Sequence, residues 1–193
     1  DPGNGTPYPG SICTSINDEL VHGIPGNRKL REGDIISVDC GTVYQGYVGD
    51  SAFTVGVGEI SKQAQHLIDT TKQALEIAIS QMVIGNRSGD VGATIEAHVE
   101  SQGFYCTHTY TGHGVGRAMH EAPQLPNYGK PGTGFVLREG MTIAIEPMVL
   151  VGGRRTRVLR DRWTVVNANG GLTAHQEHTI AVTKDGPLVL TKL

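Results

Sequence analysis

Four acidic residues lie inside segments that otherwise have the apolar pattern of β-strands. They are Asp39, Asp50, Glu146 and Glu177. A carboxylate that is buried on a strand is costly unless it is paired with a cation or coordinates a metal ion. Lys and Arg are absent from these segments and lie mostly in turns and loops. The chain must therefore expose the four acids or fold so that they share a counter-ion.

The segments around these acids predict β-strands. Residues 34–40 alternate apolar and polar side chains, with Asp39 on the polar face, and residues 47–57 are typical of a returning strand that contains Asp50. A hairpin with this connection can bring the two aspartates to the same face of a sheet. Further strands are predicted at residues 11–16, 141–146, 163–166 and 177–183.

Two helices are predicted between the groups of strands. Ser61 is a typical N-cap and Gly85 a typical stop, and apolar residues recur between them at helical spacing. A second helix is predicted to begin with Asp90 as its cap and to end at Gly103. A strand pair with carboxylates, then two helices, then further strands with carboxylates predict an α+β fold.

Residues 111–123 form a glycine-rich run that contains His113 and His120 and is too irregular to be a helix. The glycines allow backbone angles and close approaches that other residues resist. Ordering such a run costs chain entropy that other contacts must offset. The two imidazoles therefore mark a candidate site.

The acids and the imidazoles together indicate a metal centre. Four like charges around one cavity would force several carboxyl pKa values upward without a counter-ion, whereas two divalent cations would cancel the charge. A set of oxygen donors with one imidazole suits Mn, Fe, Co or Zn better than it suits a metal ion that prefers thiolate ligands. The simpler interpretation, in which each acid faces solvent, is reasonable for any one of them and much less so for all four.

Composition excludes several classes of protein. A chain of 193 residues suits one domain, and a net charge of −3 gives no electrostatic footprint for nucleic acid or an anionic membrane. No apolar run approaches the roughly 20 residues of a membrane span, and no signal-peptide pattern is visible. The three cysteines are odd in number and lack CxxC spacing, which argues against a disulfide scaffold. We expect a cytoplasmic monomer without nucleic acid or membrane partners.

In order and spacing, several segments resemble the type I methionine aminopeptidases, the pita-bread enzymes that remove initiator methionine. Together they extend over almost the whole chain, and no single one would be specific alone. The matching segments are residues 11–17, 21–25, 33–39, 49–50, 112–117, 144–148 and 177–180. The resemblance implies a pita-bread fold, with an antiparallel sheet, helices on its outer face and two pseudo-two-fold halves. The short interval between the glycine-rich run and the following acid matches type I.

The resemblance also implies a centre of two divalent metal ions, drawn from Co, Mn, Fe and Zn. It implies that Asp50 and Glu177 bridge the two ions. Asp39 would complete the coordination of one ion, and His113 with Glu146 would complete the coordination of the other. Two such ions activate a shared water as a nucleophile for the scissile carbonyl, and Glu146 would be the carboxylate that handles protons.

The substrate side of the site follows from the same resemblance. It implies that His22 and His120 contact the substrate near the scissile bond, as catalytic hydrogen-bonding groups. A methionine pocket needs apolar, polarisable walls, and the family match forms it from Tyr8, Cys13, Met119 and Trp163. The implied substrates are the N-termini of peptides or of nascent chains at the ribosome.

The chain departs from the family in two places. Family members carry helices before residue 8 and this sequence has none, so we expect residues 1–193 to be a single catalytic domain truncated at its N-terminus. His175 and Gln176 precede Glu177, where Gln followed by an aromatic residue is expected. His175 either donates to the metal cluster from behind its ligands or replaces an amide.

Two other interpretations stay open. A prolidase or aminopeptidase P of the same fold would share the metal centre, although residues 11–17 and 22–25 resemble the methionine enzymes. A binding module that has lost its metal ions would also keep the fold. Every predicted ligand position retains a metal-competent side chain, which argues against such a loss.

Overall fold

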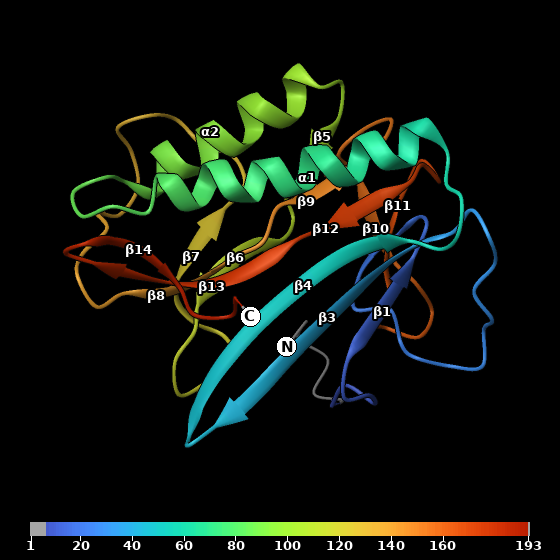
Figure 1. The fold of residues 1–193 in the computed structure, drawn as a ribbon, viewed down its shortest axis with the longest axis horizontal. Helices are drawn as coiled ribbons and strands as arrows, with labels where there is room; N and C mark the ends of the chain where they lie inside the picture. The colour runs from blue at the N-terminus through green and yellow to red at the C-terminus, as the bar shows by residue number, and fades with distance from the viewer. Residues whose placement is uncertain (1–6, 193) are drawn as a thin grey trace.

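The computed structural model of the chain describes residues 7–192. Its main element is an antiparallel sheet of order β1-β3-β4-β13-β8-β6-β7, in which β14 also pairs with β13 (Figure 1). The strands of this sheet are β1 (Cys13–Ile16), β3 (Ile35–Tyr44), β4 (Tyr47–Gly56), β6 (Thr111–Gly114), β7 (Glu121–Pro126), β8 (Thr142–Ile145), β13 (Glu177–Thr183) and β14 (Gly186–Val189). With two helices beside it, this sheet confirms the α+β expectation.

Two smaller antiparallel sheets complete the strand set. Their orders are β10-β11-β2 and β12-β9-β5. The strands are β2 (Glu19–Val21), β5 (Tyr105–Cys106), β9 (Met148–Leu150), β10 (Thr156–Val158), β11 (Val165–Asn167) and β12 (Thr173–His175). The strand predicted at residues 163–166 thus begins two residues later than expected, because Trp163 and Thr164 donate their backbone amides to Asp161 in a turn.

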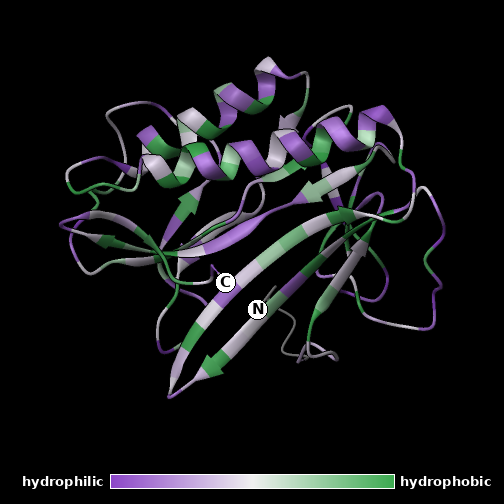
Figure 2. Ribbon diagram, viewed as in Figure 1, coloured by the Kyte–Doolittle hydropathy of each residue, from purple (hydrophilic) through white to green (hydrophobic). Residues whose placement is uncertain are grey.

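The helices α1 (Lys62–Ser80) and α2 (Ser88–Ser101) lie side by side on one face of the sheets (Figure 1). Leu67 of α1 and Ile95 of α2 are fully buried in a core that also contains Ile143 and Ile180 of the sheet. Burying one such side chain stabilises the fold by about 1.5–3 kcal/mol. Figure 2 shows hydrophilic and hydrophobic residues alternating around both helices, the pattern of helices with one buried face. Within residues 7–192, no helix is long and apolar enough to cross a bilayer.

The helix ends were only partly predicted. Ser61 does cap α1, since its side chain accepts a hydrogen bond from the Ala64 amide at 3.1 Å. The helix ends at Ser80, before Gly85, whose φ of +95° belongs to the turn that follows. The prediction that Asp90 caps α2 is wrong: Arg87 is the N-cap, and the Asp90 carboxylate reaches back to its amide at 2.9 Å. Asp90 thus supplies the second half of a capping box.

The β3–β4 hairpin sets the register of the predicted acids. Asp39 pairs with Ala52 and Gly41 pairs with Asp50. Asp50 and Ala52 are two residues apart on β4, so Asp39 and Asp50 lie diagonally on the same face. The predicted shared face of the two aspartates is therefore confirmed.

The sheet order explains how distant segments meet. Strand β13 lies between β4 and β8, with Glu177 opposite Ala52 of β4. Strand β8 lies between β13 and β6, and Glu146 follows its last residue. His113 of β6 pairs with Ala144 of β8. Five neighbouring strands thus carry the predicted acids and one imidazole to one region.

Candidate metal centre and substrate cavity

A cavity of about 770 Å³ opens beside these strands. Every residue predicted for the site lines it. These residues are Tyr8, Cys13, His22, Asp39, Asp50, His113, Met119, His120, Glu146, Trp163 and Glu177. Segments that are far apart in the sequence therefore meet around one space.

The carboxylates on the cavity wall are poorly solvated. Asp50 and Glu177 are 6% and 2% exposed. Burial raises the pKa of Asp39 and of Asp50, and it raises the pKa of Glu146 and of Glu177 well above the usual range, with the neighbouring acids adding to the effect at Asp39 and both glutamates. Among the described residues that line the cavity, none is Lys or Arg. Among these residues the cluster therefore has no Lys or Arg counter-charge.

His113 presents a lone pair to these acids. Its Nδ1 lies 3.0 Å from the Gly114 carbonyl oxygen, which can only accept, so Nδ1 donates. In the neutral ring Nε2 is then unprotonated, and it faces Asp50 Oδ2 at 3.7 Å and Glu146 Oε1 at 3.5 Å. A lone pair that faces two carboxylate oxygens is repelled by them unless a proton or a metal cation lies between them.

The donor set fits a metal ion. One ligand atom each from Asp50, His113 and Glu177 lie within 4.8 Å of one another, and all three residues are buried. Buried acids without a protein counter-ion and an imidazole lone pair aimed at them are the arrangement that a divalent cation stabilises. These observations support a metal site at this end of the cavity.

The Thr179 hydroxyl holds the strand backbone at Asp50. It accepts a hydrogen bond from the Asp50 amide at 2.9 Å and donates one to the Asp50 carbonyl at 2.9 Å. Sequence reasoning did not single out Thr179. Its position two residues after Glu177, on the same face of β13, is the only signal that pointed to it.

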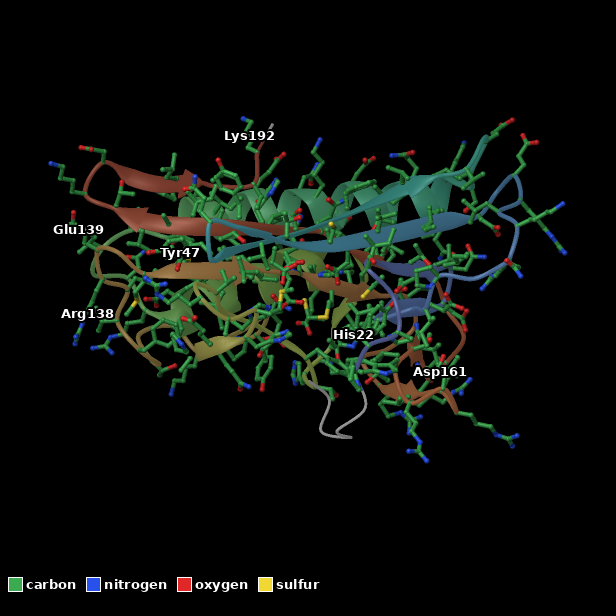
Figure 3. The ribbon with its side chains drawn as sticks, turned by 90° about the horizontal axis from the view of Figure 1, so that it is seen from below. His22, Tyr47, Arg138, Glu139, Asp161 and Lys192 are labelled. Carbon is green, nitrogen blue, oxygen red and sulfur yellow. The ribbon has the colours of Figure 1, made fainter. Side chains whose placement is uncertain are left out.

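Two further histidines lie beside this cluster. The ring of His120 is 4.3 Å from the ring of His113, centroid to centroid. His22 is half-buried, and in Figure 3 it lies toward the middle of the view, away from Arg138 and Lys192 at the edges. Burial lowers the pKa of His22 and of His120 to about 4 in each case. Both rings are therefore neutral at pH 7.

His22 has a strained backbone. Its φ of +59° lies in the left-handed region that residues other than glycine rarely adopt. Both backbone groups of the next residue, Gly23, are hydrogen-bonded. Its amide donates to Ser15 Oγ at 3.1 Å, and its carbonyl accepts from the Thr14 amide at 2.8 Å. Such strain persists where the surroundings fix it, and it is frequent at functional sites.

The predicted pocket residues form a wall of aromatic and sulfur-containing side chains. The rings of Tyr8 and Trp163 meet edge to face at 5.1 Å, and the Tyr8 hydroxyl donates to the Gly23 carbonyl at 2.7 Å. Burial, with Asp39 nearby, raises the pKa of the Cys13 thiol to about 12. Cys13 is therefore an uncharged, soft side chain on this wall.

The cavity-lining residues that sequence reasoning missed include Tyr110 and Met148. The ring of Tyr110 lies 6.1 Å from the ring of His22. Met148 lies two residues after Glu146, in a segment that the resemblance already covered. Tyr110 immediately precedes the glycine-rich run, and nothing in the sequence distinguished it from a core residue.

The sequence left two roles open for His175, a donor behind the metal ligands or a replacement for an amide. The structure buries it at 1% exposure, directly behind the acids. Its Nε2 lies 3.5 Å from Glu146 Oε2 and 3.9 Å from Glu177 Oε2. Burial lowers the pKa of His175, so the ring is neutral.

Comparisons with known proteins agree with this geometry. Metallopeptidase family M24 matches residues 2–184. A methionine aminopeptidase of Clostridium acetobutylicum is 50% identical over 95% of this chain and 74% of its own length. The crystal structure of a Thermotoga maritima methionine aminopeptidase has 52% identity and a TM-score of 0.92, covering 94% of this chain and 74% of that one.

A prolidase of Pyrococcus horikoshii has the same fold at greater distance. It is 25% identical, with a TM-score of 0.75, and covers 94% of this chain and 47% of that one. These likenesses confirm the pita-bread fold. The chain belongs to metallopeptidase family M24 and, within that family, to the methionine aminopeptidases.

Proposed function

We propose that this chain is a metal-dependent aminopeptidase that removes the N-terminal methionine from peptides and nascent chains. The proposal is carried by one observation: buried acids share a cavity with two neutral histidines and a wall of aromatic and sulfur-containing side chains, and none of the described residues that line it is Lys or Arg. Membership of the methionine aminopeptidases supports the same reaction. A monomeric, cytoplasmic enzyme that works at the ribosome stays a prediction from the sequence.

The residues proposed to hold two divalent ions are Asp39, Asp50, His113, Glu146 and Glu177. Asp50 and Glu177 are proposed as the bridging pair. Each would contribute to both ions. They are also the two most deeply buried of the four acids. When bound, divalent ions of this kind lower the pKa of water and polarise a carbonyl group. Co, Mn, Fe and Zn all suit such a donor set.

His22 and His120 are proposed to bind the reacting part of the substrate. A neutral imidazole has one N–H donor and one acceptor nitrogen. With pKa values near 4, both rings are neutral at pH 7, and each keeps one N–H that can donate to a developing oxyanion. Removing a donor of this type typically costs about 10²–10³ in kcat.

Glu146 is proposed to move the proton. It is a terminal ligand in this scheme, and it is 13% exposed at the side chain, against 3% for Glu177. Burial raises the pKa of Glu146 well above the usual range. A carboxyl group in this position can accept a proton from the attacking water and return it to the leaving amine.

The pocket is proposed to select methionine. Tyr8, Cys13, Met119 and Trp163 would surround an unbranched thioether side chain with aromatic rings and sulfur atoms. Sulfur–aromatic contacts are each worth about 0.3–1.5 kcal/mol. Their sum favours methionine over an aliphatic residue of similar size.

The direct test is peptide hydrolysis. The chain is freed of metal with a chelator, and Co, Mn, Fe or Zn is added back before assay with Met-Ala-Ser and with an Ala-Pro peptide. We expect release of methionine from the first peptide only, and only with added metal. Cleavage of the proline peptide alone would instead identify a prolidase, and binding without cleavage of either peptide would identify an inactive binding module.

A further inference from the structure

His175 is a buried imidazole without a hydrogen-bond partner. It is 1% exposed, and neither Nδ1 nor Nε2 has a partner among the described residues. An unsatisfied buried polar group costs about 1–3 kcal/mol. Such a group needs an explanation, and the surroundings of the ring supply one.

The two oxygens of Glu146 face different imidazoles. Oε1 lies 3.5 Å from His113 Nε2, and Oε2 lies 3.5 Å from His175 Nε2. Glu177 Oε2 also faces His175 Nε2, but at a longer distance of 3.9 Å. Hydrogen bonds in empty active sites are often long and shorten when the site is filled. A shift of a few tenths of an ångström would bring His175 into hydrogen-bond range of Glu146.

The backbone of His175 is fixed from an adjoining strand. Its amide donates to Thr54 Oγ1 at 2.9 Å, and the Thr54 hydroxyl donates to its carbonyl at 2.7 Å. Ser37 supports Thr54 through a hydroxyl contact of 2.8 Å. On the other side, His175 pairs with Met148 of β9. The ring is therefore held in place behind the acids.

We propose that His175 is a positioning residue: its Nε2–H donates to Glu146 Oε2 and keeps Oε1 turned toward His113. The proposal rests on the proposed function, because it concerns the same metal centre. His175 does not line the cavity, whereas Glu146, Glu177 and His113 do. An ion in the cavity would thus meet the carboxylates first, with His175 behind them. Groups that orient metal ligands from behind typically contribute about 10–100-fold in affinity.

The test compares two replacements of His175 in the full chain. His175→Gln keeps an N–H donor on a side chain of similar reach, whereas His175→Leu fills the space without a donor. Zinc affinity is measured by competition with a chelator, and the melting temperature of each metal-free variant is measured beside it. We expect His175→Leu to weaken zinc binding about 10–100-fold and His175→Gln to restore most of the loss.

His178→Leu is the matched control. His178 is on the neighbouring strand β13, but its ring points away from the acids and its Nδ1 bonds to Thr191 Oγ1 at 2.8 Å. We expect zinc affinity to be unchanged in this variant. Unchanged zinc affinity in His175→Leu, or an equal loss in His175→Gln, would overturn the proposal.

X-ray absorption on the zinc-loaded wild-type chain and on zinc-loaded His175→Leu distinguishes positioning from ligation. The imidazoles per zinc, multiplied by the zinc content per chain, give the number of coordinating rings. We expect one ring, from His113, in both proteins, and a second ring that is lost in His175→Leu would overturn the positioning role by making His175 a ligand. A wild-type chain that binds no zinc and cleaves no methionine peptide would instead refute the proposed function.

Discussion

The metal side and the substrate side of the cavity are built differently. Asp39, Asp50 and Glu177 lie on paired strands, where the ladder fixes their direction. His22 follows the end of β2 with a φ of +59°, and His120 lies in the turn between β6 and β7. The charged side of the site is therefore held by regular backbone, and the hydrogen-bonding side by turns.

The two sides also respond oppositely to burial. Burial raises the pKa of the acids and lowers the pKa of His22 and His120 to about 4. In both cases the fold disfavours the charged form. A bound cation reverses this preference for the acids, because it stabilises their charged form, while the histidines stay neutral. The difference separates the residues that need metal from those that do not.

The largest expected effect breaks the metal side alone. Glu177→Ala removes a central carboxylate, so we expect zinc affinity to fall by more than about 100-fold, since groups behind the ligands already contribute 10–100-fold. Hydrolysis of Met-Ala-Ser should become undetectable. The measurement is chelator competition beside peptide assay, with Glu139→Ala, an exposed acid far from the cavity, as control. Full activity in Glu177→Ala would refute the metal centre.

The next effect separates the two sides. In His120→Ala we expect kcat for Met-Ala-Ser to fall about 10²–10³-fold, the usual cost of losing one donor to a developing oxyanion. Zinc content should not change. Steady-state kinetics and metal analysis on the same sample check this. If zinc were lost together with activity, His120 would be a ligand and the division between the two sides would be wrong.

A third prediction concerns stability with and without metal. In the chelated protein the acids have raised pKa values, so the folded state binds more protons than the unfolded state above about pH 4. Their contribution to the free energy of unfolding is therefore lost as pH rises. At neutral pH, zinc at about 1,000 times its Kd should add about 4 kcal/mol, which is roughly 8–16 °C in Tm for a chain of this size.

The histidines give the opposite slope in the same experiment. Their pKa values of about 4 lie below the ordinary 6.5, so the unfolded chain binds more protons between these values. Their contribution is lost as pH falls from 6.5 to about 4. Thermal unfolding over pH 4–8 measures both slopes, and the low-pH loss should weaken in a His22→Gln variant. A Tm that zinc leaves unchanged at pH 7.5 would contradict the prediction.

The smallest effect sharpens the substrate side. A methyl group at Gly41 would overlap the Cε and Sδ atoms of Met119. Gly41→Ala should therefore displace Met119 and raise KM for methionine peptides by a few-fold, about 1 kcal/mol of lost packing, with kcat and zinc affinity nearly unchanged. Gly49→Ala, on the same hairpin, where the added methyl group would make only an ordinary contact with Thr191 Cγ2 at 3.6 Å, controls for a general effect on the hairpin. Equal KM in the two variants would remove Met119 from the pocket.

The same division explains what the sequence could predict. Alternation along residues 34–40 and 47–57 predicted the two strands and allowed Asp39 and Asp50 to share a face, but the register that brings them together is visible only in the structure. Strand β13 was predicted with its observed bounds, Glu177–Thr183. The family resemblance supplied the partners from other strands, since pairing across long separations is not visible in local pattern.

The turns were harder to predict. Asp90 was taken for a cap when it is the third residue of its helix, because both positions favour an acid at a helix start. The sequence around His22 did not predict its left-handed backbone conformation. His175 was visible as an unusual residue, but its burial behind Glu146 depends on β12 packing against β3 and β4, which only the three-dimensional fold reveals.

The bonds between Thr179 and Asp50 span 129 residues of sequence. They join β4 of the β3–β4 hairpin to β13. The cavity wall is therefore built from segments near both ends of the sequence. Asp39 and Asp50 cannot meet Glu177 until β13 has inserted between β4 and β8. Tight zinc binding during refolding would therefore report the closing step of assembly, and neither half of the chain, produced alone, should acquire it.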